Sequence, residues 1–460
     1  MTPGADSDKA TALRAGLGRA ALVAGIALHL LFLVSLFTHW LNPLFVEAGP
    51  GNAQGCDFFG IYQAGDNLLH GRSIYALEGS PLGSPRHVPY FYFYRYLPPT
   101  SYLAALSAAL FTPWPAYWIW VAITEGMLGL VLISLFRTRA RSPDLRVALA
   151  GITLGFTPFY LEQWMGQFSF LMAVFLWGTF WPAVRGSRAL ESGNDPEAAP
   201  ANREEGAPGM ANDREETSRE ILGGLDFWFW TAAVALKNYP ALFAFPLLRV
   251  RRWRRVVLCA GAVTLSCIPY YLFFARDGVL FVTLNFRRIS AQILPGTYGL
   301  INLVRALSWR LAASWGWTLL HLGPLHVHAG NLPMAVVGAA VGLLSLVLTW
   351  RMRRTAVPEA MALWTLTFFL TYKEIWEYHY VMLLPVIWLL SIRGDWRWPL
   401  FLGLLLALPT PYIVYRNMVA GRLVEQWPLW LVLVHFGSKV FPTIGLYAVA
   451  ARRTIEVRRP

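Results

Sequence analysis

A short stretch near the start of the chain places one carboxylate, Asp57, among aromatic and small residues. A carboxylate beside an alcohol can take its proton and make the oxygen a nucleophile. Asp57 also stands where a helix is expected to begin, and aspartate is a favourable helix N-cap. The residues alone therefore leave a general base and a helix cap open for this position. The stretch reads GCDFFGIYQAGDNLLHG over 55–71.

Cationic and polar side chains recur where later apolar segments are interrupted. Lys237 lies three residues before Pro240, and His379 lies between two short apolar runs. Ionisable residues at membrane depth are costly and suggest function. Each residue also has an ordinary explanation. Lys237 would be a snorkelling lysine at a helix end, His379 an interfacial histidine, and Glu162 and Glu377 solvated loop ends. The other polar candidates are Gln167, Lys373, Glu374 and the loop pair Arg287 and Arg288, which a solvated loop also explains.

One acid and several cations around a shared cavity suit group transfer from a phosphate carrier. The acid activates the attacking hydroxyl, and the cations stabilise the phosphate as it leaves. Tyr62, Tyr94 and Tyr96 are expected to shape the cavity, because tyrosine suits an interface with one wet end.

The elements that position these groups are membrane helices. Apolar residues make up 56% of the 460 residues and charged residues 14%, against about 25% in soluble domains. We expect an all-α polytopic membrane protein, a bundle of about 11–13 segments with short extracytoplasmic amphipathic helices. The expected segments are 17–40, 98–112, 115–136, 146–163, 166–184, 221–248, 255–275, 299–322, 332–350, 358–372, 379–392, 397–415 and 427–450.

The net charge of +13 matches the basic loops of a membrane protein rather than a nucleic-acid surface, so no nucleic-acid partner is expected. Basic clusters at 251–255, 351–354 and 451–459 place those loops in the cytoplasm. The outer loops are then 41–97, 276–298, 373–378 and 416–426. This orientation requires 98–112 to be re-entrant and 221–248 to turn back near Lys237, and conventional crossings at both places are the alternative.

The chain divides by composition into five parts. We expect a cytoplasmic tail at 1–16, a membrane module at 17–184 that includes the first outer loop, a second membrane group at 221–450 and a basic tail at 451–460. Residues 185–220 are acidic and poor in large apolar residues, which predicts a disordered cytoplasmic loop. Within the first outer loop, apolar residues at helical spacing predict a helix lying on the bilayer surface and ending at Gly71.

An ordered set of motifs over about 17–400 resembles glycosyltransferase family 87 of the GT-C superfamily. After the Asp57 stretch come a Tyr-x-Pro-Pro entry ending at Pro99, a Gly-Gln pair at 166–167, a Lys-x-x-Pro break at 237–240 and a Trp-x-x-His stretch at 376–379.

The resemblance implies a GT-C fold with Asp57 as the catalytic base. It implies transfer of a hexose, most often mannose, from a polyprenyl-phosphate donor, with inversion, on the outer face of a bacterial plasma membrane. Its partners are this donor, a lipid or glycan acceptor and membrane lipids. No cofactor or metal is expected, because Asp66 falls on the face of a continuous helix opposite to Asp57. A divalent ion stays an open alternative. The expected substrate-binding residues are Tyr62, Tyr94, Tyr96, Gln167, Lys237, Arg287, Arg288, Lys373, Glu374 and His379.

Other functions remain compatible with the sequence. The broken segments and buried cations also suit a polyprenyl-linked lipid or sugar transporter, or a flippase, although no inverted repeat is visible. A polysaccharide polymerase or ligase would share the carrier chemistry but lacks a large outer domain here. A non-enzymatic scaffold explains none of the acid and base groups.

Overall fold

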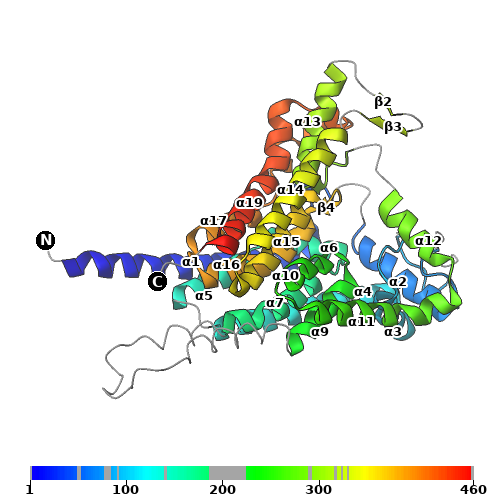
Figure 1. Cartoon of the computed structure of the whole chain (residues 1–460), viewed down its shortest axis with the longest axis horizontal. Coiled ribbons are helices and arrows are strands. Elements are labelled where there is room, and N and C mark those ends of the chain that lie inside the picture. The colour runs from blue at the N-terminus through cyan, green and yellow to red at the C-terminus, as the bar shows by residue number, and fades with distance from the viewer. Residues whose placement is uncertain are drawn as a thin grey trace.

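The computed structural model describes residues 3–48, 53–76, 84–90, 93–138, 142–185, 224–287, 293–314, 319–322, 325–328 and 331–456. Side chains are outside this description at 3–15, 286–287, 313, 319–322 and 325–328. Apart from two short antiparallel strand pairs, the regular elements of the described residues are helices (Figure 1). The expectation of an all-α membrane protein is confirmed.

Proline begins many helices of the N-terminal half. It occupies the first turn of α3, α4, α5 and α6, where its fixed φ and missing N–H cost nothing. The elements of this half are α1 (Pro3–Thr38), η1 (Asn42–Leu44), α2 (Cys56–Leu69), α3 (Pro98–Leu110), α4 (Pro113–Arg137), α5 (Pro143–Leu154), α6 (Thr157–Met165) and α7 (Ser169–Arg185).

The C-terminal half alternates long helices with short turns. Its first elements are α9 (Leu225–Leu236), η4 (Tyr239–Phe243), α10 (Ala244–Arg249), α11 (Trp253–Phe273), α12 (Asp277–Val282), η5 (Thr283–Arg287), β1 (Thr297–Tyr298) and α13 (Leu300–Ser314). They are followed by β2 (Leu319–Leu322), β3 (Leu325–His328), α14 (Asn331–Arg351), η6 (Arg354–Ala356) and α15 (Val357–Thr371). The last are β4 (Ile375–Trp376), η7 (Glu377–Leu383), α16 (Leu384–Arg393), α17 (Arg397–Ala407), α18 (Tyr412–Val419), η8 (Val424–Gln426) and α19 (Leu429–Ile455).

Among the described residues, five helices are long and apolar enough to cross a membrane: Gly16–Thr38 of α1, then α4, α11, α14 and α19. A sixth span results if α17 and α18, which are bent by 44° at their break, are counted together. The remaining expected segments are shorter or broken helices. For example, α3 has 13 residues and reaches about 20 Å, against the roughly 30 Å of a bilayer core.

Several sequence expectations need correction in detail. The segment expected at 299–322 ends as a helix at Ser314, and 319–322 is strand β2 instead. The helix expected on the bilayer surface is α2, but it is buried along most of its length. A Cβ at Gly65 would lie 2.3 Å from the backbone of Ala104, so only glycine lets α3 pack this closely. The expected disordered loop at 185–220 lies outside the described residues, except for Arg185.

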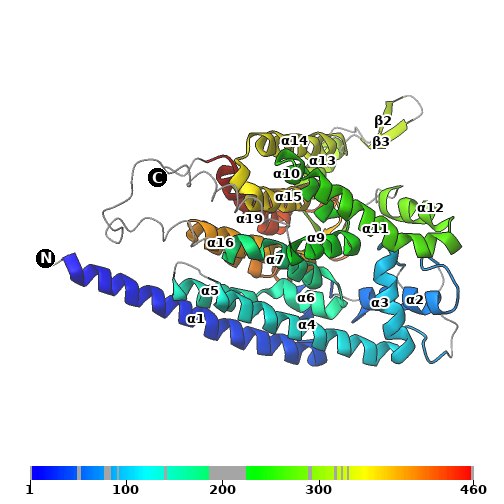
Figure 2. The ribbon, with the colours of Figure 1, turned by 60° about the horizontal axis from the view of Figure 1, so that its bottom comes forward.

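The helices form two groups joined by α7. In the first group α1 runs beside α5 and α4, as Figure 2 shows. In the second group α19 packs against α13, α15 and α17. Helix α7 contacts α4, α9, α16 and η7, and α6 also packs against η7. Segments from both groups therefore meet near η7.

A two-residue strand pair fixes the chain beside η7. Tyr298 of β1 pairs with Ile375 of β4, and Thr297 pairs with Trp376. The pairing connects two segments that the sequence predicts as outer loops, 276–298 and 373–378. It fixes the residue from which η7 begins.

Candidate active site

The expected polar residues gather around one cavity of about 400 Å³. Its walls come from the start of α2, the segment 93–97, the α6–α7 break, the residues after α9 and the segment 368–382. Of the sequence-predicted residues, the structure brings seven together here. These are Asp57, Tyr94, Tyr96, Gln167, Lys237, Glu374 and His379.

Asp57 lies in the first turn of α2 and does not cap the helix. Gly55, with φ +74°, holds the N-cap position, and no side chain caps this end. The residues one turn further, Gly60 and Ile61, line the same cavity, as a 3.6-residue repeat requires. One Asp57 oxygen, Oδ2, is buried and has no hydrogen-bond partner among the described residues. The carboxyl group is therefore available to a molecule in the cavity.

Burial raises the pKa of Asp57 above its ordinary value. Hydrogen bonding from Gln167 and Tyr378 and the charges of Lys237 and Arg95 oppose this shift in pKa. A carboxylate with a raised pKa is a stronger base than a solvated one. The positive charges of Lys237 and Arg95 keep a share of Asp57 in its ionised form, and this is the form that accepts a proton.

Gln167 connects three walls of the cavity. It follows Gly166, whose φ of +67° ends α6 and whose Cβ would lie 2.5 Å from the Cβ of Phe58, so the break requires glycine. The Gln167 Oε1 accepts a hydrogen bond from the Tyr96 hydroxyl at 2.9 Å. Its Nε2 donates to the Tyr378 hydroxyl at 3.3 Å.

Lys237 enters the cavity at the end of α9, where the chain leaves the helix in an extended conformation. Its Nζ donates to the Ser169 hydroxyl at 3.0 Å. Burial lowers the pKa of Lys237, while the negative charges of Glu162 and Asp57 act against that shift. Glu162 is 1% exposed and accepts the Phe170 N–H at 2.8 Å. The expectation of a solvated loop end at Glu162 is therefore wrong.

His379 lines the cavity as a neutral ring. Its Nδ1 accepts the backbone N–H of Trp376 at 3.1 Å, and the ring also has a hydrogen bond with the backbone of Glu374. Burial and the charge of Lys237 hold the pKa of His379 well below its ordinary value. His379 therefore contributes a polar, uncharged imidazole to the cavity wall.

An ion pair spans one wall of the cavity. Arg95 Nη1 lies 2.8 Å from Glu374 Oε2, and both side chains are partly exposed. The backbone of Arg95 accepts a hydrogen bond from the Asn285 side chain at 3.1 Å. An anion entering the cavity meets this guanidinium group next to Lys237 and His379.

Comparison with known proteins gives a family match over part of the chain. Residues 94–197 match the model of Glycosyltransferase family 87. This stretch contains Tyr94, Tyr96 and Gln167 of the cavity and covers less than a quarter of the chain. The recognition of family 87 from its motifs is confirmed, and the chain is an integral membrane glycosyltransferase. Searches among curated proteins and among solved structures gave no significant match.

Not every predicted residue of this membrane glycosyltransferase reaches the cavity. The Tyr62 hydroxyl donates to the Phe111 backbone at 2.7 Å, because a position five residues after Asp57 turns about 140° around the helix. Lys373 lies beside the cavity but does not line it. The side chain of Arg287 and the whole of Arg288 lie outside the described residues.

Among the polar cavity residues that sequence reasoning missed, Arg95 and Tyr378 are the two that act on the pKa of Asp57. Arg95 stands between Tyr94 and Tyr96, so its place between two predicted cavity residues was an available signal. Tyr378 immediately precedes the predicted His379. The first turn of the 3-10 helix η7 brings both members of this pair to the cavity.

Within the described residues of this glycosyltransferase, no three histidine, cysteine, aspartate or glutamate side chains are grouped as metal ligands. Asp66 is not part of the cavity wall. It lies 3.1 Å from Arg72 Nη2 at the other end of α2. The two aspartates of this helix therefore do not share a site.

Proposed function

We propose that this family 87 glycosyltransferase moves a hexose, with mannose as the first candidate, from a polyprenyl-phosphate donor to a hydroxyl of a lipid or glycan acceptor. The observation that carries the proposal is the placement of Asp57 in one cavity with Lys237, Arg95 and His379. An unbonded carboxylate oxygen beside several cationic or polar groups matches an alcohol nucleophile and a phosphate leaving group.

The reaction is a single displacement at the anomeric carbon. Asp57 takes the proton of the acceptor hydroxyl. At the same time, the acceptor oxygen forms a bond to C1. The bond from C1 to the phosphate oxygen breaks, and polyprenyl phosphate leaves with the bonding electrons. Attack opposite the leaving group inverts C1. The proton stays on Asp57 until solvent removes it.

The phosphate is held on the side of Lys237. The Lys237 ammonium group and the guanidinium of Arg95 supply positive charge, and the neutral His379 ring adds a polar group. A phosphate at this point competes with Glu374 for Arg95. Tyr94 and Tyr96 form the wall beside the sugar. Arg287 and Arg288 stay predictions as phosphate ligands.

The donor reaches the cavity from the membrane. Exposed apolar side chains cover most of α11 and α14, as expected for helices facing lipid, and the polyprenyl chain stays in that lipid. The basic clusters at 251–255 and 351–354 favour the cytoplasmic side, and the cavity is built from segments predicted on the opposite side. We therefore infer an active site on the outer face of a bacterial plasma membrane.

Product identification tests this function. Purified protein is incubated with radiolabelled polyprenyl-phosphate mannose and a membrane lipid extract, with the glucose and galactose donors in parallel. We expect label in a new acceptor product together with release of polyprenyl phosphate. Movement of intact donor across a reconstituted vesicle, without cleavage, would overturn the transferase mechanism in favour of a transporter.

A further inference from the structure

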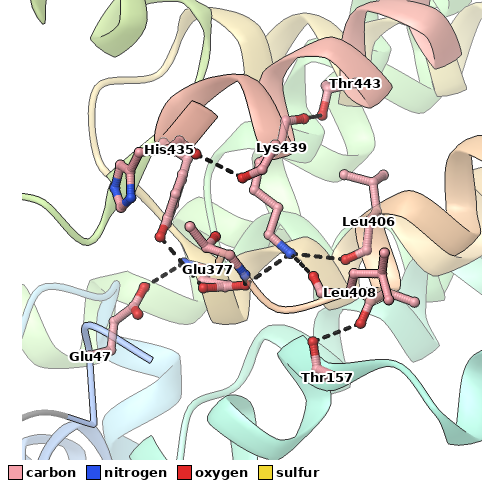
Figure 3. Close-up of polar contacts among 12 residues, drawn as sticks. Glu47, Thr157, Glu377, Leu406, Leu408, His435, Lys439 and Thr443 are labelled. Carbon is pink, nitrogen blue, oxygen red and sulfur yellow. Dashed lines mark hydrogen bonds and ion pairs between the residues drawn. The ribbon is translucent and has the colours of Figure 1, made fainter. Parts of the chain in front are cut away.

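The turn η7 has two chemically different sides. Trp376, Tyr378 and His379 line the cavity. Glu377, between them, points the other way into the protein interior and is fully buried. Figure 3 shows its carboxylate facing Lys439 of α19. A solvated loop end at Glu377, one of the sequence alternatives, is therefore excluded.

Glu377 is bonded through both its backbone and its side chain. Its Oε1 lies 2.9 Å from Lys439 Nζ and accepts the Thr410 N–H at 2.9 Å. Its own N–H donates to Oε1 of Glu47 at 2.8 Å. These partners come from α19, from the α17–α18 break and from the segment after η1. Three distant parts of the chain thus converge on the first residue of η7.

Lys439 uses its ammonium group fully in this network. Besides Glu377, its Nζ donates to the backbone oxygens of Leu406 and Leu408, at 3.0 and 2.5 Å (Figure 3). These carbonyls lie where α17 ends, so the lysine compensates groups that the broken helix cannot satisfy itself. Lys439 is 0% exposed, and no predicted site residue lies near it in sequence.

The charges of the network balance. Burial and the nearby charge of Glu377 raise the pKa of Glu47, which favours the protonated, neutral form. One negative and one positive charge then remain, on Glu377 and Lys439. Buried ion pairs of this kind add little stability over apolar residues of the same size, so stability alone does not account for the pair.

We propose that the Glu377–Lys439 ion pair positions the cavity wall that presents Tyr378 and His379 to the donor. The inference rests on the proposed function for its catalytic consequence. Tyr378 and His379 are the next two residues after Glu377, so anchoring Glu377 fixes where the turn begins. A rotation of the turn would move the His379 ring and the 3.3 Å contact between Gln167 and Tyr378 together.

Kinetics on charge-deleted variants test the positioning role. We expect Glu377→Gln and Lys439→Met each to lower kcat about 100-fold, with a smaller change in KM, as for a misplaced catalytic group. The control is Glu359→Gln, which makes the same change in a mostly buried but more exposed pair, 2.7 Å from Arg393, away from the cavity. A fall in kcat as large for Glu359→Gln as for Glu377→Gln would overturn the proposal.

The double variant Glu377→Gln/Lys439→Met separates positioning from stability. It leaves no unpaired buried charge, so we expect its melting temperature to recover relative to either single variant. We expect kcat to stay low, because the charge pair that anchors η7 is still missing. Recovery of kcat together with the melting temperature would show a structural role only and overturn the proposal.

A labelling experiment tests the positioning role of the Glu377–Lys439 pair without measuring sugar transfer. His379→Cys is introduced alone and with the double variant, and maleimide labelling is measured against the three native cysteines, which are buried. We expect several-fold faster labelling when the pair is absent, and no change for Leu69→Cys at the exposed end of α2. Equal rates at position 379 would overturn the positioning role. Absence of transfer by the unmodified protein would instead overturn the proposed function.

Discussion

Two groups of buried charges lie on opposite sides of the same turn, and they are built differently. On the cavity side, Asp57 and Lys237 face a space of about 400 Å³. On the interior side, Glu377 and Lys439 are in direct contact at 2.9 Å, with backbone groups filling their remaining bonds.

The difference separates binding from positioning. Charged groups around a cavity keep bonding capacity for a ligand, as the Oδ2 of Asp57 does. Charged groups in contact satisfy each other and fix the chain that carries them. Changes in the first group should therefore alter chemistry at nearly constant stability, and changes in the second should alter both.

The largest effect is expected from Asp57→Asn, which keeps the size of the side chain and removes the base. We expect kcat to fall about 10²–10⁴-fold, the usual contribution of a general base. Asp66→Asn is the matched control, because it makes the same change on the same helix outside the cavity. Transfer by Asp57→Asn at the rate of the unmodified protein would contradict the mechanism.

Lys237→Met is expected to follow, with a fall in kcat of about 10²–10³-fold, because it removes positive charge where the phosphate leaves. The methionine retains most of the apolar stem. The melting temperature should change little, because Lys237 has no ion-pair partner within 4 Å among the described residues. A rise in KM with an unchanged kcat would place Lys237 in ground-state binding instead.

Arg95→Gln should reduce kcat/KM for the donor about 10–100-fold, the range for a hydrogen bond to a charged group. Initial rates at several donor concentrations measure this. Arg95→Lys is the informative companion variant, because it keeps the charge and loses the planar fork. If Arg95→Gln leaves kcat/KM unchanged, Arg95 does not contact the phosphate.

The pH profile of kcat/KM should be bell-shaped. Activity needs charged Asp57, whose pKa is raised by burial, so it falls about tenfold per pH unit on the acid side, starting above the ordinary aspartate value. Activity also needs charged Lys237, whose pKa is lowered by burial, so it falls on the alkaline side earlier than for a solvated lysine. Loss of the alkaline limb in Lys237→Met would confirm that assignment, and its persistence would contradict it.

The smallest effect is expected from Glu374→Gln. Its pair with Arg95 is partly exposed, and such pairs contribute about 0–1 kcal/mol, so thermal unfolding should hardly change. Removing the carboxylate ends this ion pair and lowers the negative potential near the phosphate. The KM for the donor should therefore fall slightly. A higher KM would show that Glu374 itself contacts the substrate.

Much of the fold was predictable, because apolar runs and prolines act locally. All thirteen expected segments contain a helix, and the α9–η4 break lies at Lys237, as the Lys-x-x-Pro pattern indicated. The outcome for α2 shows the limit. Its helical spacing was correct, but its close packing against α3 depends on Gly65 meeting Ala104, residues 39 positions apart, which no local pattern shows.

The candidate site was predictable as a set of residue types but not as a geometry. Breaks and ionisable residues at membrane depth pointed to Gln167, Lys237 and His379, and all three line the cavity. Tyr62 was misassigned, because helical phase turns it away from Asp57. Lys439 was missed, because a lysine within a long apolar helix shows its role only once Glu377 of another element lies beside it.

The sequence by itself determined an all-helical membrane protein, a resemblance to family 87 and the acid and cations proposed for its chemistry, because hydrophobicity, proline positions and motif order are properties of consecutive residues. The tertiary structure decided which of these groups share a cavity and which neutralise one another in the interior. The physical reason is distance. The interaction of two charges depends on their separation and on the burial around them, and both are set by contacts between segments far apart in the chain.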